Sequence, residues 1–402
     1  METCIAKQPI FNRKLNIFGY ELLYRETASS LSYTASDGDS ASSKTIMHSF
    51  HEIGIERITG GKRAFINFTE KLILDRVATI LPNKVLVVEL LETISPSPSI
   101  LDACTMLQRQ GYMIALDDFI FEADYMPLLA VADIVKVDFL STPMEKIKLL
   151  TAAVKKHPVR LLAEKLETQE AFETALEMGF SLFQGYFFSK PVIVPSDTKL
   201  TPLKVNCIQL IRLALEPNVN FTKIADIIKH DVALSYRLLR VVNSAFFGLR
   251  YTVKNIRQAL AILGMDEVKK WITLISLAEM KDNKPDELIR MSLLRAKMME
   301  LLAPKANLTK SIDDLFMLGL MSLMDAIMDL PIDEIVSRTN ISPNIAHALV
   351  THEGDYGRLL SLVICYERSY WDEAFALAEQ YNISPQDLFN IYMAAIDWSN
   401  QL

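Results

Sequence analysis

Cysteine is scarce in this chain of 402 residues, which contains only four: Cys4, Cys104, Cys207 and Cys365. They are scattered singly, without a CxxC pair, so the spacing of a disulfide framework or of a zinc site is missing and reduced thiols are expected. Basic residues are also outnumbered, since 42 Lys and Arg stand against 49 Asp and Glu and the net charge is -7. This balance argues against broad electrostatic binding to nucleic acid, and we predict no such partner. It leaves room for a small basic pocket that takes a phosphate.

Long hydrophobic runs are missing as well. The N-terminus, METCIAKQPIF, lacks the basic start and the apolar run of a signal peptide. The longest apolar stretches, such as VLVVELL at 85–91, are interrupted by acids and are too short to span a bilayer. The sequence therefore predicts a cytoplasmic protein without a membrane span.

Hydrophobic residues make up 50% of the chain and charged residues 23%, which is typical of a packed globular protein. The chain is too long for one ordinary core, so we expect two domains. In the first half, short β-branched runs alternate with segments of helical period. The candidate strands are 16–23, 63–68, 84–90, 112–118, 133–139, 159–165 and 180–186. Strands separated by helices predict parallel pairing in a TIM-like (β/α) barrel, although a doubly wound open sheet would show the same alternation.

The pattern changes at residues 189–202, where three prolines mark a linker or a domain edge. From Leu203 onward nearly every segment carries apolar residues at helical spacing. We therefore place a barrel domain at 1–195 and an all-helical domain at 196–402, so that the fold class is α/β followed by all-α. The methionines of this half, including Met317, Met321, Met324 and Met328, are interpreted as core packing, with a pliable partner-binding surface as the alternative.

Acidic side chains fall at or near the downstream ends of the predicted strands. They are Glu21, Glu89, Asp117, Asp118, Asp138 and Glu164, and Asn67 and Lys136 occupy equivalent places. In a parallel barrel these strand ends converge on one face. Carboxylates gathered there would repel one another unless a cation lay among them, and Mg²⁺ or Mn²⁺ takes oxygen ligands from such side chains. The adjacent pair of aspartates indicates two metals that share a bridging carboxylate.

A single acid at a strand end has a simpler interpretation, because it often caps a helix or forms a salt bridge in a loop. Asp102 and Asp133 are candidates for that role. The set as a whole is harder to explain in this way, since burial of several unpaired charges is costly. The sequence therefore favours a metal site.

These residues, in this order, resemble the motifs of the EAL phosphodiesterase family, which opens cyclic di-GMP to a linear dinucleotide. The naming motif reads Glu21-Leu22-Leu23-Tyr24-Arg25, and Gln8-Pro9-Ile10 resembles the family's QPI strand. The further matches are Asn67 in FINF, Glu89 and Glu92 in ELLE, Asp117-Asp118-Phe119 in DDF, Lys136 and Asp138 in KVD, Glu164 and Glu167 in AEKLE, and Gln184-Gly185-Tyr186 in QGYFFSKP. The resemblance runs through about residues 5–191.

The resemblance implies a role for each matching residue. The metal ligands would be Glu21, Asn67, Glu89, Asp117, Asp118 and Glu164, with Mg²⁺ or Mn²⁺ as cofactor. Arg25 would hold a phosphate through its guanidinium fork. The catalytic residues would be Glu164, which polarises the water, Lys136, which orients that water or stabilises the developing charge, and Glu21. Gln8, Asp138, Glu167 and Gln184 would support the bound ligand.

Two departures from the family pattern bear on the site. Active members follow the paired aspartates with a glycine-rich loop, DFGTGYSS, whereas this chain reads DDFIFEADYMPLL, without glycine. Glycine reaches backbone conformations that Ile120, Phe121 and Glu122 resist, so a second metal would be held less well. Lys165 replaces the glycine of the AEGVE motif and brings a cation near the acids. A homodimer is left open, because relatives use the altered loop for dimer contacts.

Residues 203–402 resemble the HDOD domain, an all-helical relative of the HD hydrolases that has lost their metal-binding His-Asp pair. The resemblance is carried by 224–248 and 256–264, above all by Asn243-Ser244-Ala245 with Phe246 and Phe247. The order of the two domains is similar to that of the bacterial EAL-HDOD signalling proteins of the YuxH type. It implies a protein partner that binds through the HDOD domain, and we expect no metal centre in this half.

Two functions stay open at this point. The first is a metal-dependent phosphodiesterase that hydrolyses cyclic di-GMP to linear pGpG, with the HDOD domain as a regulatory or output module. The second is a catalytically weak or inactive protein that binds cyclic di-GMP as a sensor, or a scaffold for other proteins. Retention of the metal ligands favours the first, and loss of the glycine loop favours the second.

Overall fold

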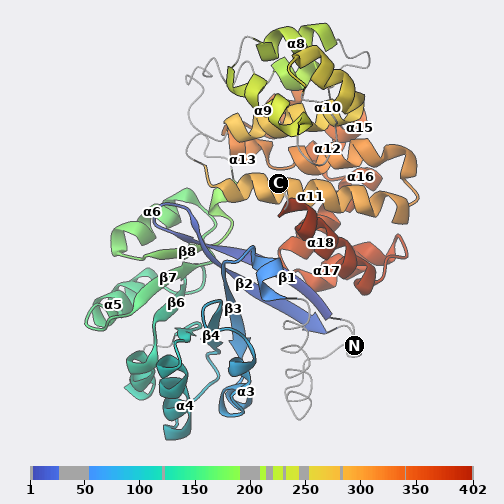
Figure 1. Ribbon diagram of the computed structural model, residues 1–402. Helices are drawn as coiled ribbons and strands as arrows, with labels where there is room; N and C mark the ends of the chain where they lie inside the picture. Colours follow the sequence, from blue (N-terminus) through green and yellow to red (C-terminus); the bar gives the residue numbers. More distant parts are fainter. Residues whose placement is uncertain are drawn as a thin grey trace. The chain divides into compact units, whose positions relative to one another are not determined.

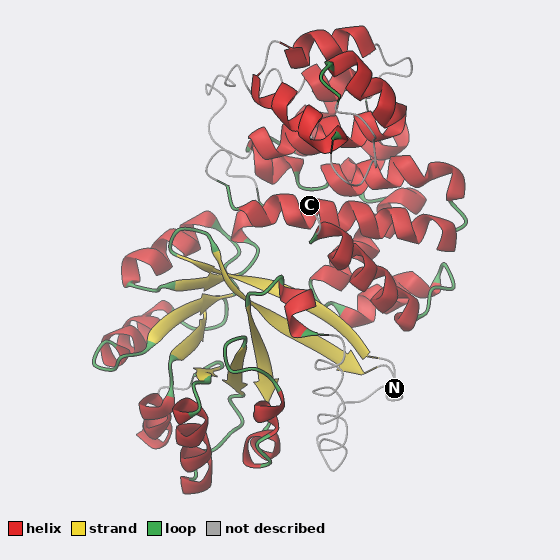
Figure 2. Cartoon of the chain, in the orientation of Figure 1, coloured by secondary structure: helices red, strands yellow, loops and turns green. Residues whose placement is uncertain are grey.

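The computed structural model describes residues 3–26, 54–119, 123–190, 209–213, 221–229, 232–243, 253–280, 284–339 and 341–400. The chain forms two compact units (Figures 1 and 2). The first combines Met1–Lys190 with Ile364–Leu402, and the second is Pro191–Val363. The sequence predicts one helical domain over 196–402, whereas in the structure Ile364–Leu402 belongs to the unit that contains the barrel.

The first unit is built on a closed barrel of eight strands, β1 to β8 in chain order. They are β1 (Thr3–Asn12), β2 (Ile17–Glu26), β3 (Arg63–Phe68), β4 (Leu86–Leu90), β5 (Met113–Leu116), β6 (Ile134–Asp138), β7 (Arg160–Glu164) and β8 (Leu182–Gln184). The prediction of a TIM-like barrel is confirmed, and closure of β8 onto β1 excludes the open sheet.

One strand, β1, departs from the parallel pairing that the sequence predicts. β1 runs antiparallel to both of its neighbours, β2 and β8, whereas the pairs from β2 to β8 are parallel. β1 and β2 form a hairpin joined by the short turn 13–16, and a turn this short permits only antiparallel pairing.

The interior of the barrel is filled by one apolar side chain from each of seven strands. They are Ile10, Phe65, Val87, Ala115, Ile134, Leu162 and Leu182, all buried. The strands β4 and β6 are buried along their whole length, as expected where helices cover the outside of a parallel sheet. This core excludes water from the barrel, so the polar side chains at the strand ends lie above an apolar floor.

Helices alternate with the strands and begin at recognisable caps. The unit contains α2 (Ile55–Thr59), α3 (Glu70–Leu74), α4 (Pro98–Arg109), α5 (Met144–Val154) and α6 (Gln169–Met178), with 3-10 turns η1 (Val77–Ile80), η2 (Ala123–Val131) and η3 (Phe187–Ser189). The side chains of Thr69, Ser97 and Thr168 accept hydrogen bonds from the first turns of α3, α4 and α6, which satisfies backbone donors that a helix leaves open.

The C-terminal helices α17 (Trp371–Glu379) and α18 (Pro385–Ser399) complete the first unit. α18 packs on β1 and α2. The hydroxyl of Tyr392 accepts a hydrogen bond from the backbone N–H of Lys7 at 3.2 Å, and Tyr392 is fully buried. The strand β1, which opens the chain, is therefore covered by the helix that closes it.

The second unit is helical throughout its described part. Its helices are α8 (Phe221–Lys229), α9 (Val232–Val242), α10 (Ile256–Met280), α11 (Asp286–Lys305), α12 (Ile312–Met321), α13 (Met324–Met328), α14 (Ile332–Arg338) and α15 (Pro343–Thr351), with the turn η5 (Thr309–Ser311), and α16 (Gly354–Glu367) leads out of it. The prediction of an all-α region is confirmed. Met317, Met321, Met324 and Met328 are buried, which confirms core packing.

Asn243 has a structural role in this unit. Its side chain accepts a hydrogen bond from the backbone N–H of Val253 at 2.7 Å and donates to the carbonyl of the same residue at 2.8 Å. This pair of bonds ties the end of α9 to the segment before α10, which explains why an amide is needed here. Ser244, Ala245, Phe246 and Phe247 lie outside the described residues.

Candidate metal centre and ligand site

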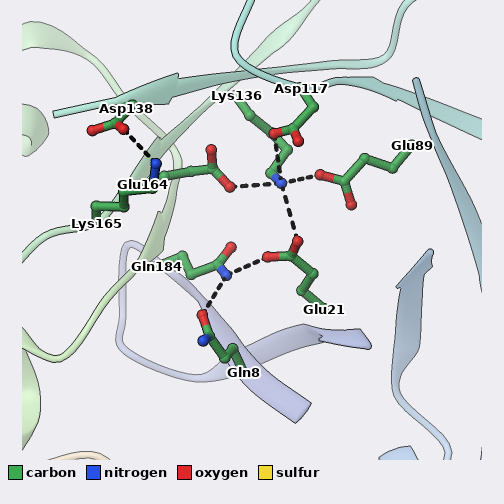
Figure 3. A network of polar contacts seen from close by, with 9 residues as sticks. All are labelled: Gln8, Glu21, Glu89, Asp117, Lys136, Asp138, Glu164, Lys165 and Gln184. Atoms are coloured by element: carbon green, nitrogen blue, oxygen red, sulfur yellow. Dashed lines mark hydrogen bonds and ion pairs between the residues drawn. The ribbon is translucent and has the colours of Figure 1, made fainter. Parts of the chain in front are cut away.

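The predicted site residues meet at the carboxyl-terminal rim of the barrel. Glu21 lies on β2, Asn67 on β3, Glu89 on β4, Lys136 on β6 and Glu164 on β7, and Asp117 directly follows β5. In the strand register Asn67 lies beside Glu89, and Asp138 lies beside Glu164. The side chains of Glu21, Glu89, Asp117, Lys136 and Glu164 point toward one another (Figure 3). The sequence-based expectation that these acids converge on one face is therefore met in the geometry.

The ammonium group of Lys136 lies at the centre of this cluster. Its Nζ contacts Oε1 of Glu89 and lies 2.6 Å from Oε1 of Glu164, 2.9 Å from Oδ1 of Asp117 and 3.6 Å from Oε1 of Glu21. Lys136 is 1% exposed and Glu89 is fully buried. A buried charge without a partner is costly, so each of these groups depends on the others.

The second oxygen of Glu21 is held by Gln184, and Gln184 is held in turn by Gln8. Nε2 of Gln184, on β8, donates to Oε2 of Glu21 at 2.5 Å and to Oε1 of Gln8, on β1, at 3.1 Å (Figure 3). Gly185 follows with φ 140°, and a Cβ there would lie 2.2 Å from the carbonyl oxygen of Leu166. The turn after β8 therefore requires glycine, and it presents Gln184 to Glu21.

Asp138 and Lys165 form a second ion pair beside the cluster. Nζ of Lys165 lies 2.5 Å from Oδ2 of Asp138, while Oδ1 of Asp138 accepts hydrogen bonds from the backbone N–H groups of Leu140 and Ser141. Burial alone would raise the pKa of Asp138, but these bonds outweigh it and hold the pKa below its usual value. Both oxygens of Asp138 thus have partners, and Lys165 adopts a left-handed backbone with φ 53°.

Burial and mutual repulsion perturb the acids strongly. Burial, together with the charges of Glu164 and Glu21, raises the pKa of Asp117 to about 9. Burial raises the pKa of Glu164 to about 7, against the opposing effect of Lys136. Asp118 is more exposed than the other acids. Its pKa is still raised by partial burial, although the nearby Lys165 opposes this shift. Strongly perturbed pKa values of this kind cluster at functional sites.

The donor set fits a divalent cation. Oxygen atoms of Glu89, Asp117 and Glu164 all lie within 4.8 Å of one another. With all four carboxylates ionised, the ammonium of Lys136 would leave three negative charges, which a single divalent ion would largely neutralise in place of protons on Asp117 and Glu164. Among the described residues, the buried atoms Oδ1 of Asn67 and Oε2 of Glu89 have no hydrogen-bond partner. Such oxygens are the ligands that Mg²⁺ and Mn²⁺ prefer.

Two predicted ligand-binding residues are engaged away from the cluster. Glu167 pairs with Lys190 at 3.3 Å, and both side chains are about half exposed. Nη2 of Arg25 lies 2.8 Å from Oδ1 of Asp372, on α17. No local sequence pattern predicts a role for Asp372, because its partner Arg25 is far away in the chain. The sequence places Lys165 near the acids but does not specify its pairing with Asp138.

A small apolar recess adjoins the acidic cluster. It is lined by Leu90, Leu91, Glu92, Ile94, Leu116, Asp117, Phe119, Tyr125 and Leu128. Glu92, which matches the second acid of the ELLE motif, therefore lines the same recess as Asp117. Ile120, Phe121 and Glu122, which replace the glycine loop, lie outside the described residues.

The comparison with known proteins agrees with this architecture. The EAL domain matches residues 2–191 and the HDOD domain matches residues 200–328. The chain is 35% identical to the Bacillus subtilis protein YuxH, over 100% of this chain and 99% of that one. It is 32% identical to the Vibrio cholerae protein named cyclic di-GMP phosphodiesterase CdgJ, over 100% of this chain and 93% of that one.

Solved structures of EAL proteins are similar to about half of this chain. A standalone EAL protein from Vibrio cholerae O395, in its c-di-GMP-bound form, is 22% identical, covers 47% of this chain and 92% of its own, and has a TM-score of 0.36. The chain belongs to the family of signalling proteins that join an EAL domain to an HDOD domain. Within the described part of the chain, no helix is both long enough and apolar enough to cross a membrane.

Proposed function

We propose that this protein is a metal-dependent phosphodiesterase that hydrolyses cyclic di-GMP to linear pGpG, and that its HDOD domain is a regulatory or output module. The observation that carries the proposal is the buried excess of negative charge around Lys136, beside the unpartnered oxygens of Asn67 and Glu89. Membership in a family that includes a protein named as a cyclic di-GMP phosphodiesterase supports the same substrate.

The metal would be Mg²⁺ or Mn²⁺, held by Glu21, Asn67, Glu89, Asp117 and Glu164, with Asp118 as a further ligand. Such an ion supplies a Lewis acid that activates water and offsets the charge of a phosphate. Gln184 keeps one oxygen of Glu21 oriented, and Gln8 keeps Gln184 oriented in turn. Outer contacts of this type fix the direction in which a ligand side chain presents its oxygen.

The remaining residues bind the substrate and move protons. Water attacks one phosphodiester phosphorus, the bond from phosphorus to the ribose 3′ oxygen breaks, and the proton that the water loses is balanced by the one that the 3′ oxygen takes up. Glu164 polarises the water, and Lys136 orients it or stabilises the charge that develops on the phosphate. Arg25 holds a phosphate with its planar guanidinium. Asp138 and Glu167 support the site at its edge, each through its own lysine.

One observation favours a second function, that of a sensor which binds cyclic di-GMP without opening it. Lys136 contacts all four carboxylates of the cluster and thereby competes with a metal for the same oxygens. If the ammonium is not displaced, the phosphate can still bind at the rim while hydrolysis is absent. The two functions differ in product formation and not in binding.

The deciding experiment uses the full chain with Mn²⁺ and cyclic di-GMP. We expect linear pGpG, resolved by chromatography, and no product from Glu21→Gln, which keeps the size of the side chain but loses its charge. Glu145→Gln is the matched control, because Glu145 lies on the exposed face of α5 and pairs only with Lys148 within the described residues. Binding without product identifies the sensor, and absence of both binding and product rejects the proposal.

A further inference from the structure

The C-terminal segment Ile364–Leu402 is part of the unit that contains the barrel. Asp397, on α18, forms an ion pair with Arg57, on α2, through both of its oxygens, and the side chain of Asn400 donates to the carbonyl of Arg57 at 2.8 Å. On the other side, Arg368 lies over the ring of Tyr186 at 4.6 Å, just after β8. The segment is therefore attached on both sides of the β1–β2 hairpin.

An aromatic cluster stiffens this segment where it meets the hairpin. The ring of Tyr366 is 5.0 Å from that of Tyr392 and 5.3 Å from that of Trp371, and Trp371 is 6.2 Å from Phe375. Tyr366 and Tyr392 are fully buried. Ring pairs at these separations add to the energy of apolar burial, so the start of α17 has a fixed position on the barrel.

Arg25, on β2 of the barrel, is the residue that α17 contacts from this position. It lies four residues after Glu21 on β2, and residues separated by two or four positions in a strand face the same side. The rise along a strand puts the two Cα atoms roughly 13 Å apart. Arg25 therefore projects on the side of β2 that carries Glu21, beyond the rim at which the acidic cluster lies.

Two side chains of α17 hold the guanidinium of Arg25. Oδ1 of Asp372 lies 2.8 Å from Nη2, and the ring of Phe375 lies 5.9 Å from the central carbon. Asp372 and Phe375 are three residues apart, so they share one face of the helix. A guanidinium has five N–H donors, and a contact through one amino group leaves others for a phosphate.

We infer that Asp372 and Phe375 are positioning residues for Arg25, and that the C-terminal segment is a structural component of the barrel's ligand site. This rests on the proposed function, in which Arg25 binds a phosphate of cyclic di-GMP. A long side chain loses rotamer freedom when it binds a ligand. Because Asp372 and Phe375 have already restricted Arg25, less of this cost falls on binding, which is the general effect of preorganisation.

The test measures binding of cyclic di-GMP to the full chain by calorimetry, with Ca²⁺ in place of the activating metal to suppress turnover. We expect Asp372→Asn to weaken binding about fivefold, equivalent to about 1 kcal/mol, the upper range of an exposed ion pair. Asp372→Glu should restore most of the affinity. In the background of Arg25→Ala, Asp372→Asn should have no further effect, because the residue acts only through Arg25.

Asp397→Asn is the matched control, since it removes another ion pair between the same segment and the barrel without touching Arg25. It should leave the affinity unchanged. Wild-type affinity in Asp372→Asn, or an equal loss in Asp397→Asn, overturns the inference while the proposed function stands. Tighter binding by Asp372→Asn also overturns it and identifies Asp372 as a competitor of the phosphate. If the wild-type chain does not bind cyclic di-GMP, the proposed function fails and the inference fails with it.

Discussion

Among the residues that the structure describes, Lys136 is the single cation paired with the four carboxylates of the cluster, and its replacement tests the electrostatic account of the site. Lys136→Met keeps an unbranched side chain that is only one atom shorter, and it removes the charge. The ammonium is 1% exposed and Glu89 is fully buried, so the loss leaves carboxylates buried without their partner. Removal of one member of a buried ion pair costs about 3–5 kcal/mol.

The lower end of this range applies, because the raised pKa values of Asp117 (about 9) and Glu164 (about 7) allow protons to neutralise part of the charge at pH 7. For a unit of roughly 150–250 residues, each kcal/mol lowers Tm by about 2–4 °C. We therefore expect Lys136→Met to lower Tm by about 6–12 °C in EDTA. Trp371 and Trp398 lie in the barrel unit and Trp271 in the second unit, so fluorescence reports the unfolding of both, and the barrel transition is the one expected to shift.

Mn²⁺ should reverse much of this loss. The ion and the ammonium use the same oxygens, so the variant should gain more Tm from Mn²⁺ than the wild-type chain does. Lys148→Met is the control, because Lys148 is exposed and pairs with Glu145 on the outside of α5. Equal Tm values for Lys136→Met and wild type in EDTA, or no response of either chain to Mn²⁺, would refute the reasoning.

Three further outcomes are expected. Mn²⁺ affinity, measured by calorimetry, should rise between pH 6 and pH 9, since protons compete at Glu164 and Asp117, whose pKa values are raised to about 7 and about 9; a flat profile contradicts this. The pKa of Asp397 is lowered by its hydrogen bond with Arg57, so the pair stabilises the fold above the unfolded value of about 3.9 and loses that effect as the pH falls further. The Tm difference between wild type and Asp397→Asn should therefore narrow from pH 5 to pH 3, and a constant difference argues against the pair. Gly185→Ala places a methyl group 2.2 Å from a backbone oxygen and should cost at least about 2 kcal/mol in denaturant unfolding, whereas wild-type stability would mean that the turn can adjust.

The barrel could be predicted because each strand has a recognisable local sequence pattern. Runs such as LVVEL at 86–90 and IVKVD at 134–138 are rich in β-branched residues and carry an acid at the last position or the one before it, and the segments between them have helical period. This pattern does not predict that β1 runs antiparallel to both of its neighbours. Its neighbours are set by the hairpin with β2 and by closure onto β8, and closure is a property of the whole sheet.

The site could be predicted as a set of residues, because parallel strands bring their carboxyl ends to one rim. The contacts that these side chains make with one another could not be predicted. The resemblance implies that Lys136 orients the water or stabilises the developing charge, and the structure brings its ammonium within reach of four carboxylates. Lys165 takes a left-handed backbone conformation, which only the local fold reveals. These details depend on side-chain directions that the order of residues does not encode by itself.

The sequence alone determined the two kinds of architecture and the acids at the strand ends, since periodicity and residue type act over a few neighbouring positions. Tertiary structure alone decided that Ile364–Leu402 packs with the barrel and that Asp372 meets Arg25. Those contacts join the two ends of the chain. They form because buried rings such as Tyr366 and Tyr392 and the strand β1 cover one another's apolar surface, and no local pattern carries that information.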